Sequence, residues 1–331
     1  MKRIQWTCLV GLIIGTILLY SHREPYAPLV MLNLIEKEQG LLKKGVPRRL
    51  KIQPSQEKEI LKQIKHSIHR GITENKRKTE LIVSFTSFPR RMSKLYVTLH
   101  SLFTQTVKPD RIILWLAKEE FQEVTLPSFL KDFERMGLEV RWVEQNMRSY
   151  NKLVPTLQEH PGAIVITVDD DRYYASDLVE TLYQSYEKYP KEIHCRWASD
   201  VRRDSDGRVR PYSQWGYVSE ESNSGFSISC QGFNGTLYPP KALHPDVVKS
   251  SIFRKYAPTA DDIWFWVNSL KNKAKSRVVK DKTKSWYLVE IENDIKLSSS
   301  NLGKDGGNDT QLAQLKHYFD YEAFFSRNAS A

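Results

Sequence analysis

The sequence has few cysteines, and none of them lies in a metal-binding pattern. The three are Cys8, Cys195 and Cys230, and there is no CxxC motif or Cys/His cluster. Structural zinc is usually held by closely spaced cysteine and histidine pairs. The sequence therefore argues against a zinc site. It leaves two possibilities for Cys195 and Cys230, a disulfide in an oxidising compartment or two buried thiols.

The folded part of the chain also lacks the excess of positive charge that nucleic-acid binding needs. The net charge is +11, but residues 1–80 hold 16 Lys and Arg against 7 Asp and Glu, which leaves +2 for residues 81–331. A nucleic-acid-binding domain carries basic charge on its own surface. We therefore expect no nucleic-acid partner. A basic segment beside a membrane favours contact with anionic lipid headgroups.

Only one long apolar run occurs, and it lies at the N-terminus. Lys2 and Arg3 precede an uncharged stretch from Ile4 to Ser21, which is near the lower limit for a helix that crosses a bilayer. No small-x-small cleavage site follows it. We predict an uncleaved signal anchor over residues 1–22 and a single-pass membrane protein, with a cleaved signal peptide as the alternative. The orientation stays open: Golgi type II if eukaryotic, inner membrane with a cytoplasmic face if bacterial.

Residues 23–79 are predicted to form a basic stem. The segment is rich in Lys, Gln and Glu, and residues 56–70 show helical spacing of apolar side chains, which predicts a short amphipathic helix. Those apolar residues are Ile60, Leu61, Ile64 and Ile68.

An α/β domain is predicted over residues 80–325. Apolar runs indicate strands at 81–86, 111–116, 138–143 and 163–168. Helical spacing indicates helices at 93–104, 127–136 and 152–159. Strands that alternate with helices predict a Rossmann-like, mostly parallel central sheet with helices on both faces. Such sheets bind ligands at the carboxyl ends of their strands.

Three consecutive carboxylates, Asp169, Asp170 and Asp171, follow the fourth predicted strand directly. Adjacent negative charges repel one another, and burying them without a counter-charge is costly. Asp169 and Asp171 point to the same side of an extended chain, so both can reach one ligand. Mn²⁺ and Mg²⁺ prefer such oxygen ligands and often bridge to phosphates. The triplet therefore predicts a metal and phosphate site, with a solvated acidic turn as the alternative.

The order of elements, with the string ITVDDD at residues 166–171 ending a strand, resembles the nucleotide-sugar glycosyltransferases of the GT-A fold, family 2-like, over about residues 80–320. The resemblance implies a hexosyltransferase with a DxD motif that acts in polysaccharide biosynthesis. Asp171 would contact the metal that bridges the donor diphosphate. Asp169 would contact ribose or metal, and Asp170 would approach the donor sugar. The acceptor would be a glycan or a lipid-linked sugar.

The resemblance also implies donor-binding residues outside the triplet. In that fold the end of the first strand meets the base and ribose, where Thr86 and Ser87 stand here. Arg90 or Arg91 would pair with a phosphate or lie on the surface. Lys152, just before a predicted helix, would neutralise the diphosphate or be exposed.

A glycine-containing stretch at residues 229–240 is the next candidate. Its glycines, Gly232 and Gly235, permit close approach of the backbone to a ligand, and the resemblance implies that the donor sugar lies nearby. The alternative is a plain turn.

Two acidic residues, Asp261 and Asp262, open a predicted aromatic helix. Acidic residues at a helix start are favoured by the helix dipole alone. The resemblance to inverting enzymes implies a further role, in which Asp262 takes the proton from the acceptor hydroxyl and Asp261 supports it. A retaining mechanism stays open if Asp262 is not a base. Trp264 and Trp266 follow as an aromatic face for the acceptor or as core residues.

The polar, glycine-rich segment 301–309 is predicted either as a lid over the donor or as a disordered connector. Within it, Asn308 would reach the donor phosphates and Asp309 the metal.

Two other functions remain. A nucleotidyltransferase normally has a glycine-rich loop after the first strand, and residues 87–91 contain no glycine. A non-catalytic membrane-tethered carbohydrate-binding protein would not need so many clustered carboxylates.

Overall fold

The computed structural model describes residues 48–50, 52–218, 220–280, 286–289 and 307–328. The chain divides into two compact units, one containing residues 52–67 and the other residues 47–51 and 68–331. The predicted anchor at residues 1–22 and residues 301–306 of the predicted lid lie outside the described residues. Within the ranges given above, no helix is both long and apolar enough to cross a bilayer.

The smaller unit contributes one described helix, α3, from Pro54 to His66. Pro54 begins its first turn, and the Gln53 and Gln56 side chains each bond to the other residue's backbone as a capping box. Ser67 adopts an extended backbone and ends the helix. The predicted amphipathic helix is therefore present but shorter. Ile68, which we expected on its apolar face, lies beyond the end and is 81% exposed.

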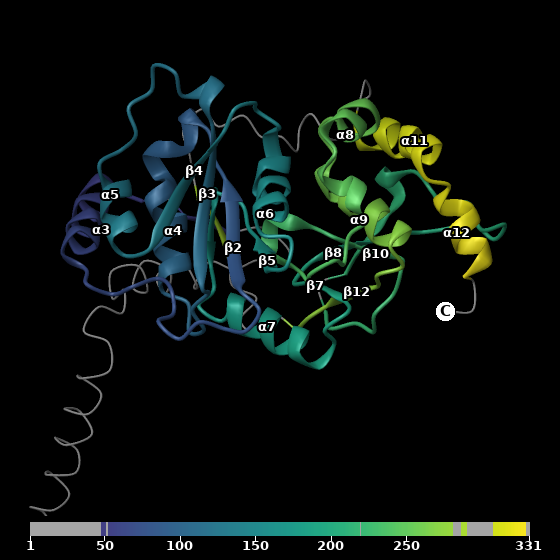
Figure 1. The fold of residues 1–331 in the computed structure, drawn as a ribbon, viewed down its shortest axis with the longest axis horizontal. Coiled ribbons are helices and arrows are strands. Elements are labelled where there is room, and N and C mark those ends of the chain that lie inside the picture. Colours follow the sequence, from purple (N-terminus) through teal and green to yellow (C-terminus); the bar gives the residue numbers. More distant parts are fainter. Residues whose placement is uncertain (1–47, 51, 219, 281–285, 290–306, 329–331) are drawn as a thin grey trace, which may run out of the picture. The chain divides into compact units, whose positions relative to one another are not determined.

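A seven-stranded sheet in the order β12-β7-β11-β5-β2-β3-β4 forms the centre of the larger unit (Figure 1). Its strands are β2 Leu81–Thr86, β3 Arg111–Ala117, β4 Leu138–Val143, β5 Ile164–Thr167, β7 Ile193–Cys195, β11 Thr236–Tyr238 and β12 Ser276–Val278. Both pairings of β11 are antiparallel and the other four are parallel. The predicted α/β fold class with a mostly parallel central sheet is confirmed, as are its first four strands.

The helices of the larger unit flank the sheet or pack on one another (Figure 1). They are α4 Leu95–Phe103, α5 Phe129–Arg135, α6 Val154–Glu159, α7 Leu178–Lys188, α8 Ser250–Tyr256, α9 Asp261–Lys271, α11 Asn308–Tyr318 and α12 Tyr321–Arg327. Ile82, Ile113 and Val165 join one core cluster with residues of α6 and α9. The alternate residues Val83 and Ile112 are equally buried, which is the pattern of a parallel sheet enclosed on both sides.

Short 3₁₀ helices connect these elements. They are η1 Pro89–Lys94, η2 Lys118–Glu120, η3 Arg148–Lys152, η4 Tyr212–Gln214, η5 Gly232–Asn234 and η6 Pro245–Val248. The predicted helix at 152–159 begins two residues late, at Val154, because Lys152 ends η3.

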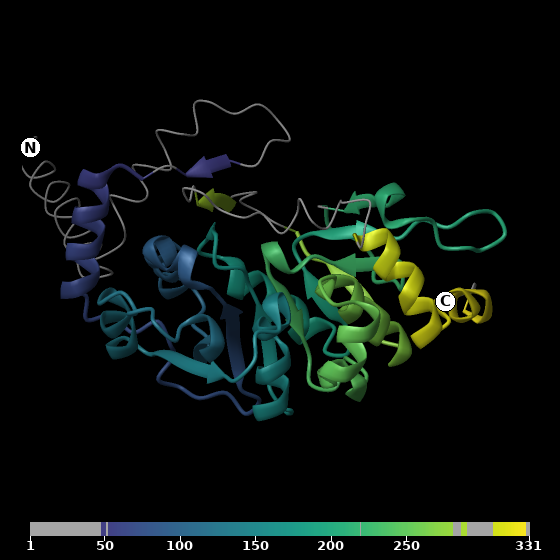
Figure 2. The same cartoon turned by 90° about the horizontal axis from the view of Figure 1, so that it is seen from above.

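Two three-stranded sheets complete the larger unit. One, in the order β10-β8-β9, is antiparallel and consists of β8 Ala198–Asp200, β9 Gly216–Val218 and β10 Ile228–Cys230. The other joins three segments that are distant in sequence, β1 Arg48–Leu50, β13 Trp286–Val289 and β6 Arg172–Tyr174. Figure 2 shows β1 (purple arrow) beside β13 (yellow-green arrow), with which it pairs in parallel. The strand β1 lies in the segment that we expected to be stem.

The indoles of Trp264 and Trp266 belong to the core. They are 0% and 3% exposed, and their Nε1 atoms donate to the carbonyls of Val247 and Phe226. The helices α8, α11 and α12 surround α9, which carries both residues (Figure 1). Trp264 and Trp266 were predicted either to contact the acceptor or to pack in the core, and the structure shows that they pack in the core.

Candidate functional site

The acidic triplet lies where β5 ends at the carboxyl edge of the parallel sheet. The apolar run Ile164–Thr167 is fully buried, and after Val168 the chain turns through Asp169–Asp171 into β6. The buried hydroxyl of Tyr174 accepts the backbone N–H of Asp169 at 2.8 Å and donates to the carbonyl of Phe233 at 2.9 Å. One tyrosine thus fixes the triplet to the Gly232–Asn234 turn.

Arginines neutralise the second and third carboxylates. Arg91 Nη1 lies 2.5 Å from Asp170 Oδ1 and 3.1 Å from Asp171 Oδ2, and its side chain is 9% exposed. Arg172 Nε lies 3.5 Å from Asp171 Oδ1. The Ser87 hydroxyl donates to the other oxygen of Asp170 at 2.5 Å. Charge-assisted bonds of this kind hold a carboxylate firmly in place.

Lys152 connects the triplet to the second acidic group. Its ammonium lies 3.2 Å from Asp169 Oδ1 and 3.0 Å from Asp261 Oδ2, and its side chain is 5% exposed. Burial alone would lower the pKa of Lys152, but the charges of Asp169, Asp261 and Asp262 outweigh it and raise the pKa well above its usual value. The lysine therefore stays charged between the two carboxylate groups.

Asp262 has the properties of a base that works near neutral pH. The backbone N–H of Gly232 donates to its Oδ1 at 3.1 Å. Burial, followed by the charge of Asp261, raises the pKa of Asp262 to about 7, although Lys152 opposes this rise. A general base is most effective when its pKa lies near the operating pH.

The first two carboxylates of the triplet, Asp169 and Asp170, differ in pKa. Burial would raise the pKa of Asp169, but the positive charges of Lys152 and then Arg172 lower it. Burial raises the pKa of Asp170 to about 6, against the opposing charge of Arg91. The neighbouring charges and burial thus shift the pKa values of these two adjacent carboxylates in opposite directions.

The start of α9 is fixed by another helix. The Gln311 side-chain oxygen in α11 accepts the backbone N–H groups of Thr259 and Ala260, at 2.9 and 3.0 Å. These two residues immediately precede Asp261 and Asp262. α11 therefore holds the acidic pair in position although it begins more than 40 residues later in the chain.

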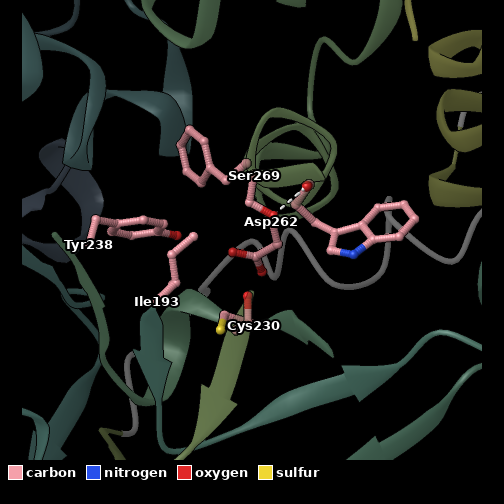
Figure 3. Close-up of a pocket in the computed structure, with 8 residues that line it drawn as sticks. Ile193, Cys230, Tyr238, Asp262 and Ser269 are labelled. Atoms are coloured by element: carbon pink, nitrogen blue, oxygen red, sulfur yellow. Dashed lines mark hydrogen bonds between the residues drawn. The ribbon is translucent and has the colours of Figure 1, made fainter. Parts of the chain in front are cut away.

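A small cavity of about 10 Å³, room for about one water molecule, borders Asp262 (Figure 3). Tyr238 points its hydroxyl toward the Asp262 side of this cavity, and Cys230 lies on the opposite side (Figure 3). The other lining residues are Ile193, Phe265, Trp266, Ser269 and Ser276.

Cys195 and Cys230 are free, buried thiols, so the structure shows no disulfide between them.

The predicted donor residues at and after the end of β2 do not all face the triplet. Ser87 reaches it, whereas the Thr86 hydroxyl donates to the carbonyl of Trp115 in β3. Arg90 is exposed, and Arg91 is the arginine that contacts the carboxylates. Of the two arginines considered for a phosphate, the structure thus brings only Arg91 to the triplet.

The two predicted glycines have different surroundings. A Cβ on Gly232 would lie 2.6 Å from Lys152 Nζ and 3.2 Å from Asp262 Oδ1, so this backbone passes directly against the site. Gly235 has a φ of +89°, and a Cβ there would lie 2.6 Å from Leu178 in α7. Gly235 is therefore explained by backbone conformation and packing.

The two residues predicted at the end of the lid open α11. Asn308 is buried, and its side chain and that of Ser199 both hydrogen-bond to the Tyr212 hydroxyl, whose pKa is raised to about 12 by burial and then by Asp262. Asp309 is exposed and accepts the backbone N–H of Ser213 at 3.1 Å. Asn308 therefore lies on the Asp262 side of the site.

The predicted metal ligands are not brought together. Within the described ranges, no group of three His, Cys, Asp or Glu side chains could hold a metal ion. Asp309 contacts η4, and the triplet's oxygens already face Lys152, Arg91 and Arg172. Because three cations of the chain supply the counter-charge, the arrangement does not fit the metal set predicted from Asp169, Asp171 and Asp309.

Sequence reasoning missed several residues that build the site. Arg172 and Tyr174 follow the triplet at alternating positions of β6, and Gln311 and Tyr212 act from distant segments. Arg172 could have been found from its position directly after the triplet. No local signal marks Gln311 or Tyr212, since their contacts depend on tertiary packing.

No protein-family model matches the chain, and no curated protein matches it. Among solved structures it is similar to S. aureus TarS 1–349 in complex with UDP, at 12% identity and a TM-score of 0.42, with 75% of each chain covered. It is also similar to the inositol-1-phosphate CTP transferase from T. maritima, at 10% identity and a TM-score of 0.40, over 73% of this chain and 98% of that one. TM-scores below 0.5 leave function to be judged from the chain's own residues.

Proposed function

We propose that this protein is a glycosyltransferase that moves a hexose from a nucleotide-diphosphate donor to a hydroxyl of a glycan or lipid-linked acceptor. One observation carries the proposal: Lys152 bridges Asp169 of the triplet and Asp261 of the second acidic pair, at 3.2 and 3.0 Å. Two carboxylate groups distant in sequence, one in the turn after β5 and one in the first turn of α9, thus meet at the carboxyl end of a parallel sheet, where such folds bind their ligands.

The triplet side suits the donor. The hydroxyl groups of a nucleotide sugar can donate hydrogen bonds to carboxylates. Its diphosphate can accept bidentate hydrogen bonds from guanidinium groups. Asp169 and Asp170 supply the carboxylates, and Arg91 and Arg172 supply the guanidinium groups. The metal ion remains a prediction from the sequence.

The Asp262 side suits the acceptor. Asp262 takes the proton of an acceptor hydroxyl while that oxygen bonds to the anomeric carbon. The bond from the anomeric carbon to the diphosphate oxygen breaks, and its electron pair leaves with the diphosphate. Attack opposite the leaving group inverts the anomeric centre. A pKa of about 7 leaves a large fraction of Asp262 ionised at neutral pH.

The cellular setting of the proposal comes from the sequence. Residues 1–22 would anchor the protein in a membrane and residues 23–79 would form its basic stem. The catalytic domain, predicted over residues 80–325, would then act on a growing polysaccharide or a lipid-linked sugar at the membrane surface.

The test is a donor screen with the full chain in detergent. Wild-type protein is incubated with UDP-, GDP- and CDP-sugars, with and without Mn²⁺, and free nucleotide is measured. We expect nucleotide release from one donor. Asp262→Asn should abolish release, whereas Asp206→Asn, an exposed aspartate paired with Arg208, should not. Failure with every donor would refute the proposal. Pyrophosphate release from a nucleoside triphosphate and a sugar phosphate would assign nucleotidyl transfer instead.

A further inference from the structure

The sheet β10-β8-β9 has two chemically different faces. Side chains alternate along a strand, so paired residues share a face. Ala198, Ile228 and Cys230 point into the core cluster, and Val218 packs against it. The opposite face, here called the outer face, carries the row Tyr217–Ser199–Ser229 fixed by the pairing register, and two residues further along the same strands Trp197 and Gln231.

Three partly exposed aromatic rings form a series from this face toward the site. Tyr217 is 75% exposed, and its ring centroid lies 6.1 Å from that of Trp197. Trp197 lies 5.9 Å from Phe233, which directly follows Gly232. Because Gly232 donates to Asp262, the inner end of the series adjoins the proposed base. Large aromatic side chains are normally buried, so a group of them that is partly exposed to solvent indicates a binding surface.

Neutral polar groups accompany the rings. The Tyr212 hydroxyl is bonded by Ser199 and Asn308. Ser229 and Asn308 are buried residues, 0% and 7% exposed. The Ser229 hydroxyl and the Asn308 side-chain oxygen have no hydrogen-bond partner among the residues that the structure describes. Buried polar groups in native proteins are nearly always paired, so each of these atoms calls for a partner from outside the described protein atoms.

We propose that the outer face binds a neutral pyranose ring of the acceptor, stacked on Trp197 and Tyr217. A pyranose presents a face of C–H groups suited to an aromatic ring and a rim of hydroxyls suited to serine and amide groups. Trp197, Tyr217, Ser199, Ser229 and Gln231 carry no charge, so an anionic ligand would find no counter-charge among them. The inference rests on the proposed function, since it supplies that reaction's acceptor site.

The experiment measures pyranose binding and nucleotide binding separately on the same full-length protein. Saturation-transfer NMR is recorded with methyl glucoside, galactoside, mannoside and N-acetylglucosaminide, each in the presence of UDP. Trp197→Ala and Tyr217→Ala are compared with Trp142→Ala. Trp142 is a matched control because it is also exposed, at 40%, and lies on the edge strand β4. Circular dichroism confirms that each variant is folded.

We expect wild type and Trp142→Ala to bind at least one pyranoside. Trp197→Ala and Tyr217→Ala should each weaken that binding about tenfold, as expected for the loss of an aromatic anchor. The binding isotherms for UDP, GDP and CDP should be the same for these two variants as for wild type. Absence of pyranoside binding by wild type, or full binding by both variants, would overturn the acceptor site while leaving the donor proposal standing. Pyranoside binding without any nucleotide binding would sink the proposed function instead.

Discussion

Replacing Lys152 by methionine tests the central electrostatic contact of the site. The change keeps the length of the side chain and removes the charge that faces Asp169 and Asp261. With an effective dielectric constant of about 20, each contact at 3.0–3.2 Å is worth about 5 kcal/mol before desolvation. Part of this lost attraction is offset in the variant, because no ammonium group has to lose its hydration when the variant folds. Breaking a buried ion pair costs about 3–5 kcal/mol on balance, and we expect Lys152→Met to lose that much stability at pH 8.

The pH dependence gives the prediction a second readout. Lys152 lowers the pKa values of Asp169 and Asp262, so its removal raises both in the folded variant. The folded variant then binds more protons than the wild type, and its stability deficit should shrink as the pH falls from 8 to 5.

Urea unfolding followed by tryptophan fluorescence at both pH values measures the effect, with m-values compared between proteins. Lys118→Met is the control, because Lys118 is 54% exposed and pairs with Glu144 at the surface, where loss costs about 0–1 kcal/mol. A Lys152→Met deficit as small as that of the control, or one independent of pH, would refute the reasoning.

Three further predictions concern the same site. Gly232→Ala should lower transfer at least about tenfold and stability by about 1–3 kcal/mol, because its Cβ would meet Lys152 at 2.6 Å, whereas Gly162→Ala meets nothing within 4 Å and should behave as wild type in both assays. The rate constant kcat should rise with pH and level off above about 7 as Asp262 ionises; Asp262→Asn should remove that limb and lower kcat by about 10²–10⁴-fold, and an unchanged profile would exclude Asp262 as the base. EDTA should leave nucleotide binding by wild type unchanged in calorimetry, while Arg91→Met, which removes the arginine shared by Asp170 and Asp171, should make binding depend on Mn²⁺; EDTA-sensitive binding by wild type would restore the metal site predicted from the sequence.

The fold was largely predictable because its signals are local. The buried runs at 81–86 and 111–117 are mostly apolar, as parallel strands enclosed on both faces must be, and the edge strand at 138–143 is marked by its alternating apolar residues. The antiparallel strand β11 was not identified as part of the central sheet. It is three residues long, and its pairing with β5 and β7 is set by tertiary contacts.

The candidate site was predictable in its acidic residues and much less so in their partners. The triplet and the acidic pair are visible in the sequence because they follow a strand and open a helix. Charge repulsion within the triplet led to the prediction of a metal ion. The sequence could not show that Arg91 folds back from η1 and that Lys152 comes from η3 to supply the opposing charge.

The short strand β1 has a practical consequence for any shortened form of the protein. It covers one edge of β13, whose other edge pairs with β6, and Val289 of β13 donates to the carbonyl of Asp171. A fragment that starts at the predicted domain boundary, residue 80, would lose β1 and expose a row of unpaired backbone groups. Such an open edge is a template for strand addition by another chain. Aggregation of that fragment would therefore reflect a missing strand, and starting upstream of Arg48 should cure it.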